Sequence, residues 1–155
     1  MPACEPNSTR FLTKIRPRVA RAGRAERGLL DTSVIVDLHL IDPAVLPVES
    51  AISAITLAEL AAGPHALADA DERAQRQDRL QRTEAEWHPI PFGANAARAY
   101  GRLYAAAASR GRKPRGGLAV DFMIAATALA EGLPLFTRNP TDFAAIGKLV
   151  DIVAV

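Results

Sequence analysis

Residues 28–38 read GLLDTSVIVDL and predict a short buried strand, a polar turn and a helix in immediate succession. Leu29 and Leu30 form the apolar strand, which ends at the polar triplet that begins with Asp31. Apolar residues return from Val34 onward and favour a helix. An acidic side chain, that of Asp31, is therefore expected at the carboxyl end of a central strand.

The same alternation continues along the chain. Four more strands are predicted, at residues 51–55, 87–92, 133–137 and 149–155, with helices between them near residues 56–62, 66–86, 94–109, 119–130 and 142–146. Pro89 and Pro91 mark the strand at 87–92 as an edge or irregular one. Strands that alternate with helices predict an α/β fold with a parallel sheet covered by helices on both faces. In such sheets the ligand site lies beyond the carboxyl ends of the strands.

Length and composition place the chain among single-domain globular proteins. It has 155 residues, of which 49% are apolar and 5% aromatic, so a core of small aliphatic side chains on a sheet is expected. Its apolar runs fall short of the roughly 20 residues that span a bilayer. The single cysteine, Cys4, excludes an internal disulfide framework. We expect a cytoplasmic protein that does not engage a membrane.

The charge is unevenly distributed. Residues 1–27 hold seven Lys and Arg against Glu5 and Glu26, a local charge of +5, whereas the whole chain carries +2. Three prolines and the lack of apolar periodicity predict a disordered basic tail over 1–27, followed by one domain over 28–155. Such a tail suits contact with an anionic polymer, although a disordered leader is the preferred explanation.

Four acidic residues stand among apolar neighbours just after strands or near helix starts: Asp31, Glu59, Asp121 and Asp142. A parallel sheet would place them at one end of the fold. Each also has a structural alternative. Asp31 suits a turn, Glu59 suits the third position of a capping box begun by Thr56, and Asp121 and Asp142 suit the first turn of a helix.

Gathered carboxylates repel one another unless a cation joins them. Mg²⁺ prefers oxygen ligands, and no His or Cys lies near these acids, which argues against zinc. A carboxylate-held Mg²⁺ polarises phosphoryl oxygens, activates water and orients the attack, while a free carboxylate accepts the proton. If the four acids do meet, the pattern therefore indicates phosphodiester hydrolysis.

Four segments resemble the ordered motifs of PIN-domain toxins of the VapC type. They are residues 29–38, 52–60, 121–128 and 133–143, and the resemblance covers about residues 28–155. It implies a three-layer α/β/α PIN-like domain with a central, mostly parallel sheet. It also implies that Asp31, Glu59 and Asp121 bind Mg²⁺ or Mn²⁺, and that Asp142 is a fourth, more variably placed acid. The basic tail has no counterpart in the family.

The resemblance further implies a function and partners. Such proteins are toxins of type II toxin–antitoxin systems and cleave RNA, often tRNA or another structured RNA. They form homodimers, and a VapB-type antitoxin inhibits them by covering the site. A catalytically silent PIN-like module that binds RNA or a partner remains the alternative. A haloacid-dehalogenase-type phosphatase needs a second Asp at the position of Ser33, and a receiver domain needs an acidic pair where Asp31 stands alone.

Other side chains near the four acids suit supporting roles. Ser33, Thr137 and Asn139 can hydrogen-bond a carboxylate or share its role, although turn capping accounts for them as well. Cationic side chains that could contact RNA phosphates are Arg112, Lys113 and Arg115 on a loop before Asp121, together with Arg138. A solvated loop is the alternative for these cations.

Overall fold

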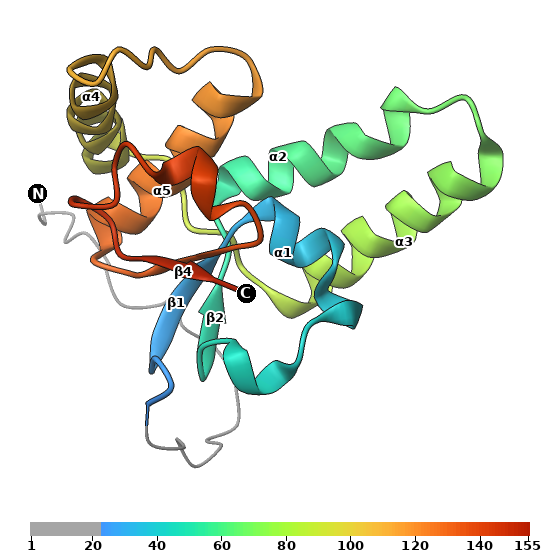
Figure 1. The fold of residues 1–155 in the computed structure, drawn as a ribbon. Helices are drawn as coiled ribbons and strands as arrows, with labels where there is room; N and C mark the ends of the chain where they lie inside the picture. The colour runs from blue at the N-terminus through green and yellow to red at the C-terminus, as the bar shows by residue number, and fades with distance from the viewer. Residues whose placement is uncertain (1–22) are drawn as a thin grey trace, which may run out of the picture.

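The computed structural model describes residues 23–155. Of the basic tail predicted for residues 1–27, residues 1–22 lie outside the described residues. The described chain contains a four-stranded sheet in the order β2-β1-β3-β4. Its strands are β1 (Arg27–Leu30), β2 (Glu49–Ala51), β3 (Leu135–Thr137) and β4 (Ile152–Ala154), and every neighbouring pair is parallel (Figure 1). The predicted parallel sheet is therefore confirmed.

Helices fill the segments between the strands. They are α1 (Thr32–Val36), α2 (Ala54–Ala62), α3 (Ala70–Glu86), α4 (Ala94–Ala108) and α5 (Gly117–Glu131). Short 3-10 turns add η1 (Leu38–Leu40), η2 (Pro43–Val45), η3 (Gly63–Ala66) and η4 (Pro140–Phe143). Helices α2 and α3 form a hairpin that projects from one side of the molecule (Figure 1). Gly132 ends α5 in the left-handed conformation, at φ 65°, as a glycine after a helix commonly does.

Two apolar clusters lie on opposite faces of the sheet because successive strand side chains alternate. Leu29 and Leu135 belong to the cluster covered by α4 and α5. Leu30 and Phe136, one position further along the same strands, belong to the cluster that includes Val34 of α1. The expected α/β/α layering is therefore confirmed.

The predicted strand at 87–92 is wrong. The structure has a single parallel bridge there, between Ser53 and Ile90. Ile90 donates to the carbonyl of Ile52, and its own carbonyl accepts from Ala54. Pro89 and Pro91 lack backbone N–H groups, so they cannot extend the ladder in either direction.

The predicted start of α2 also needs correction. Ser53, not Thr56, is the N-cap, and its Oγ accepts a hydrogen bond from the Thr56 amide. Glu59 is consequently the sixth residue of α2 rather than part of a capping box, so its carboxylate is free for another role.

Ordered contacts begin upstream of Gly28. The Arg24 guanidinium donates to the carbonyls of Leu46, Pro43 and Pro47. The carbonyls of Ala25 and Glu26 accept from the amides of Val48 and Glu49, which continues the β1–β2 ladder. Within the described chain, no helix combines the length and hydropathy needed to cross a membrane.

Candidate metal centre

Asp31 lies at the carboxyl end of β1, just before α1, and its side chain is only 3% exposed. Its Oδ2 accepts hydrogen bonds from Ser33 Oγ, at 2.7 Å, and from Thr137 Oγ1, at 2.8 Å. Its Oδ1 is buried and accepts no hydrogen bond from the described residues, and the side chain does not cap α1. A buried carboxylate oxygen without a donor is costly unless a cation satisfies it.

The two hydroxyl groups that hold Asp31 are themselves held. Thr137, at the end of β3, is fully buried, and its Oγ1 accepts from the Asn139 amide at 3.0 Å. Ser33 Oγ accepts from the Arg138 amide at 3.2 Å. Asn139 thus acts through its backbone N–H. This network joins the ends of the two central strands and fixes the direction of the Asp31 carboxylate.

Glu59 faces the same region from α2. Thr32 Oγ1 donates a hydrogen bond to Glu59 Oε2 and so links the first residue of α1 to the second turn of α2. Sequence reasoning did not single out Thr32. Its position next to Asp31 was the available signal, because a hydroxyl group beside a strand-end carboxylate can orient a second acid.

Asp121 is the fifth residue of α5, which places it in the second turn instead of the predicted first turn. Its pKa is raised from 3.8 to about 6. Burial is the main cause, and repulsion from Asp31, Glu59 and Asp142 adds to it. The fold therefore brings the four predicted acids into one electrostatic environment.

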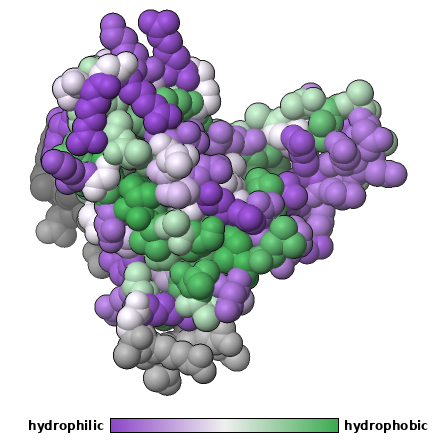
Figure 2. All heavy atoms as spheres, in the orientation of Figure 1, coloured by the Kyte–Doolittle hydropathy of each residue, from purple (hydrophilic) through white to green (hydrophobic). Residues whose placement is uncertain are grey.

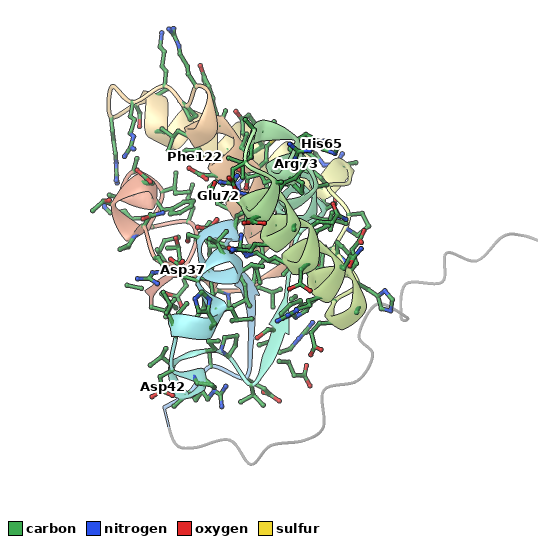
Figure 3. All side chains as sticks on the ribbon, turned by 90° about the vertical axis from the view of Figure 1, so that its right-hand side faces the viewer. Asp37, Asp42, His65, Glu72, Arg73 and Phe122 are labelled. Carbon is green, nitrogen blue, oxygen red and sulfur yellow. The ribbon has the colours of Figure 1, made fainter. Side chains whose placement is uncertain are left out.

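Asp142 lies in η4, with its carboxylate 3.4 Å from the Arg112 guanidinium. Arg138 is paired as well, 3.0 Å from Asp37, the C-cap residue that follows α1 (Figure 3). Sequence reasoning missed Asp37 as the partner of Arg138. Lys113 and Arg115 are exposed, and no ion pair joins either to another described residue.

The residues present fit a hard divalent ion in donor type. All four acids supply oxygen, Asp31 Oδ1 lacks a hydrogen-bond partner, and burial together with repulsion from the other three acids raises the pKa of Asp121. Among residues 23–155, no three Asp, Glu, His or Cys side chains are gathered closely enough to hold one ion as they stand.

A groove lies elsewhere, between α1, η1 and α3, and contains none of the four acids. It is lined in part by Ile35, Val36, Leu38, Arg79, Arg82 and Trp87. Leu40 and Val45, in the 3-10 turns after α1, are 67% and 48% exposed. Figure 2 shows broad apolar surface on the face that carries α1 and β4. The acids therefore occupy the carboxyl edge of the sheet, separate from this groove.

Known proteins are similar to this chain in sequence. The PIN domain family matches residues 28–149 of the chain. Ribonuclease VapC5 of Mycobacterium tuberculosis is 38% identical over 122 residues, which cover 77% of this chain and 87% of that protein. VapC ribonuclease Y4jK of Sinorhizobium fredii is 38% identical over 140 residues, which cover 81% and 94%.

Solved structures show the same fold. A chain in the crystal structure of VapBC-5, a toxin–antitoxin system of Mycobacterium tuberculosis, matches with a TM-score of 0.75 and 38% identity, over 84% of this chain and 99% of that chain. A chain of FitAcB from Neisseria gonorrhoeae matches with a TM-score of 0.60 and 27% identity, over 81% and 94% of the two chains.

Proposed function

The chain belongs to the PIN-domain family and, within it, to the VapC type, and from this membership we propose that it is the toxin of a type II toxin–antitoxin system. Its proposed activity is that of an endoribonuclease that hydrolyses RNA phosphodiester bonds and requires Mg²⁺, for which Mn²⁺ can substitute. The observation that carries this proposal is the buried Asp31 carboxylate. One of its oxygens has no partner, and three further acids raise the local negative charge.

Asp31, Glu59, Asp121 and Asp142 are the residues that would hold the ion. When bound, Mg²⁺ supplies charge stabilisation for the phosphoryl oxygens and lowers the pKa of water. Ser33 and Thr137 fix the Asp31 carboxylate, and Thr32 fixes that of Glu59. A carboxylate that remains free accepts the proton of the attacking water. The chain's own contribution is therefore to orient acids whose repulsion favours a cation.

The proposed RNA contacts come from the basic side chains beside the acids, which are Arg112, Lys113, Arg115 and Arg138. Cationic side chains bind phosphates of any sequence and fix the register of the substrate. The proposed substrate is tRNA or another structured RNA. Because Arg112 and Arg138 are already paired with carboxylates, Lys113 and Arg115 hold the charges that are free for phosphates.

The proposed partner is a cognate VapB-type antitoxin, since a solved relative that is 38% identical to this chain comes from a VapBC system. The groove beside α1 and the exposed Leu40 give this antitoxin apolar surface to bury. We also propose a homodimer, for which Tyr104 on α4, 38% exposed and adjacent to Tyr100, offers apolar contact area. We propose a cytoplasmic location for the protein, because the proposed substrate is cytoplasmic RNA.

The proposal is tested by incubating purified protein with total cellular RNA in Mg²⁺ or in EDTA, for the wild type and for Asp121→Ala. We expect discrete fragments from the wild type in Mg²⁺ alone. Cleavage that survives both EDTA and Asp121→Ala would exclude the four-acid mechanism. RNA that binds but stays intact, where a known metal-dependent ribonuclease is active, would instead identify a silent binding module.

A further inference from the structure

The basic loop over residues 110–116 is fastened to η4 by two of its arginines. Arg110 donates to the Ala144 carbonyl at 3.2 Å, and Arg112 donates to the Thr141 carbonyl at 3.2 Å. The second terminal nitrogen of Arg112 contacts Asp142 Oδ1 at 3.4 Å. The Arg112 guanidinium group therefore contacts both a backbone carbonyl and the Asp142 carboxylate of η4.

Lys113 and Arg115, the other cations of the loop, lie between two backbone contacts that hold its ends. The Arg112 amide donates to the Ala107 carbonyl at the end of α4, and the Ala119 amide donates to the Gly116 carbonyl at the start of α5. Pro114 is buried between Lys113 and Arg115, which are both exposed. Arg112 thus serves as an anchor, whereas Lys113 and Arg115 extend into solvent close to the helix that carries Asp121.

We propose that Asp142 is a positioning residue for the RNA substrate: through Arg112 it holds the 110–116 loop so that Lys113 and Arg115 contact the RNA phosphates. This inference rests on the proposed function and assigns Asp142 a task that is independent of the metal. The pair is partly exposed, at 38% for Arg112 and 43% for Asp142, so its effect is one of orientation and is moderate in size.

The direction in which Asp142→Asn changes RNA affinity distinguishes the positioning role from the effect of removing a negative charge. Loss of a negative charge beside a polyanion strengthens binding, because repulsion is removed. Asp121→Asn, which leaves the loop contacts intact, should behave in this way. Asp142→Asn removes a similar charge but also weakens the hold of Arg112 on η4, where the contact with the Thr141 carbonyl remains, so the loop is less well oriented and binding should weaken.

The experiment measures binding of a fluorescent single-stranded RNA oligonucleotide by anisotropy in EDTA, where metal coordination plays no part. We expect Asp142→Asn and Arg112→Gln each to raise Kd by about 2–5-fold. The double variant should bind RNA no more weakly than either single variant, because both substitutions disrupt the same contact. The charge swap Arg112→Asp with Asp142→Arg should restore much of the affinity. Lys113→Gln with Arg115→Gln should reduce the salt dependence of binding.

Tighter binding by Asp142→Asn, equal to that of Asp121→Asn, would overturn the positioning role while leaving the nuclease proposal intact if the wild type cleaves RNA in Mg²⁺. A wild type that neither binds nor cleaves RNA would overturn the proposed function itself. Thermal melting of each variant checks that it is folded. If Asp142→Asn does not fold, Arg112→Lys, which keeps the charge but loses the forked contact, replaces it and should weaken binding.

Discussion

The charged form of Asp121 is unfavourable, mainly because the side chain is buried and also because the other three acids repel it. Because its folded-state pKa lies near 6 and its ordinary value is 3.8, the folded protein binds more protons than the unfolded chain between these values. Asp121 therefore makes a contribution to the stability of the metal-free protein that is fully present below pH 3.8 and is lost as the pH rises toward 6.

Asp121→Asn should remove this dependence. At pH 7 in EDTA we expect the variant to be more stable than the wild type by ~1–2 kcal/mol, because solvent screens part of the repulsion around a half-buried carboxylate. The expected rise in Tm is ~2–4 °C per kcal/mol. Thermal melts of both proteins from pH 4 to pH 8 measure it. Parallel pH profiles would contradict the assignment, and added Mg²⁺ should raise the Tm of the wild type more than that of the variant.

Thr137 should be indispensable to the Asp31 carboxylate. Thr137→Val keeps the shape but removes the donor to Oδ2 and the acceptor for the Asn139 amide, so we expect a loss of roughly 1–3 kcal/mol in the free energy of unfolding. The matched control is Thr127→Val. Thr127 is equally buried but bonds a helix carbonyl, that of Met123, so its replacement should cost less. Urea denaturation compares them, and equal losses would argue against a special role for Thr137.

The sequence predicted the individual acids better than their surroundings. Asp31 was identifiable because a strand-end carboxylate between apolar runs has few structural explanations. Ser33 and Thr137 could be named as possible donors to a carboxylate, but the contact of Thr32 with Glu59 and the pairing of Asp37 with Arg138 depend on neighbours far apart in the chain. Local patterns cannot specify which distant hydroxyl group or guanidinium group completes a contact.

At the level of elements, the centre of the sheet leaves no room for a side chain at Gly28. A Cβ atom there would lie 2.3 Å from the ring of the buried Phe136 on β3. The close approach lets the Phe136 ring cover β1, which in turn supports the strand end that carries Asp31.

Gly28→Ala should therefore destabilise the protein by roughly 1–3 kcal/mol. Gly101→Ala is the matched control, because Gly101 lies in α4 with no atom within 4 Å of an added Cβ. This control should stabilise by about 0.5–1 kcal/mol, as alanine favours a helix. Denaturant unfolding of both variants tests the contrast, and two changes of the same sign would show that the packing at Gly28 can relax.

Element types were largely predictable and element ends were not. Hydrophobic periodicity located five of the helices, whereas Ser53 and Thr56 are both competent caps and only the course of the backbone decides between them. The strand predicted at 87–92 contained a pairing residue, Ile90, but its prolines confined the pairing to one bridge. The sequence pattern predicts whether a segment is a helix or a strand, and tertiary contacts decide at which residues it begins and ends.

On the scale of the whole molecule, the groove beside α1 and the carboxyl edge of the sheet are separate surfaces with separate proposed partners. At the tip of the projecting hairpin, Arg73 donates to the carbonyls of Leu67 and Ala68, which ties the η3–α3 turn together near His65 (Figure 3). The hairpin can therefore serve as a stable wall of the groove.

Leu40→Glu should separate inhibition from activity. Since Leu40 is 67% exposed and outside the acidic site, the variant should fold and cleave RNA as the wild type does. A charge on this apolar surface should weaken inhibition by the antitoxin by about 10-fold or more. Titration of RNA cleavage with purified antitoxin measures this, with the exposed Glu84→Gln on α3 as a control. Unchanged inhibition would place the antitoxin elsewhere.

The sheet order has a consequence for synthesis. The β1 segment is synthesised early in translation, but its neighbour β3, with the Thr137 hydroxyl group that holds Asp31, is synthesised only at residues 135–137. Non-local pairing of this kind is completed late in folding. A chain still attached to the ribosome, surrounded by RNA, therefore lacks a finished site until almost all of it has emerged. Arrested nascent chains that end before Leu135 should leave RNA intact, so the topology itself delays the onset of toxicity.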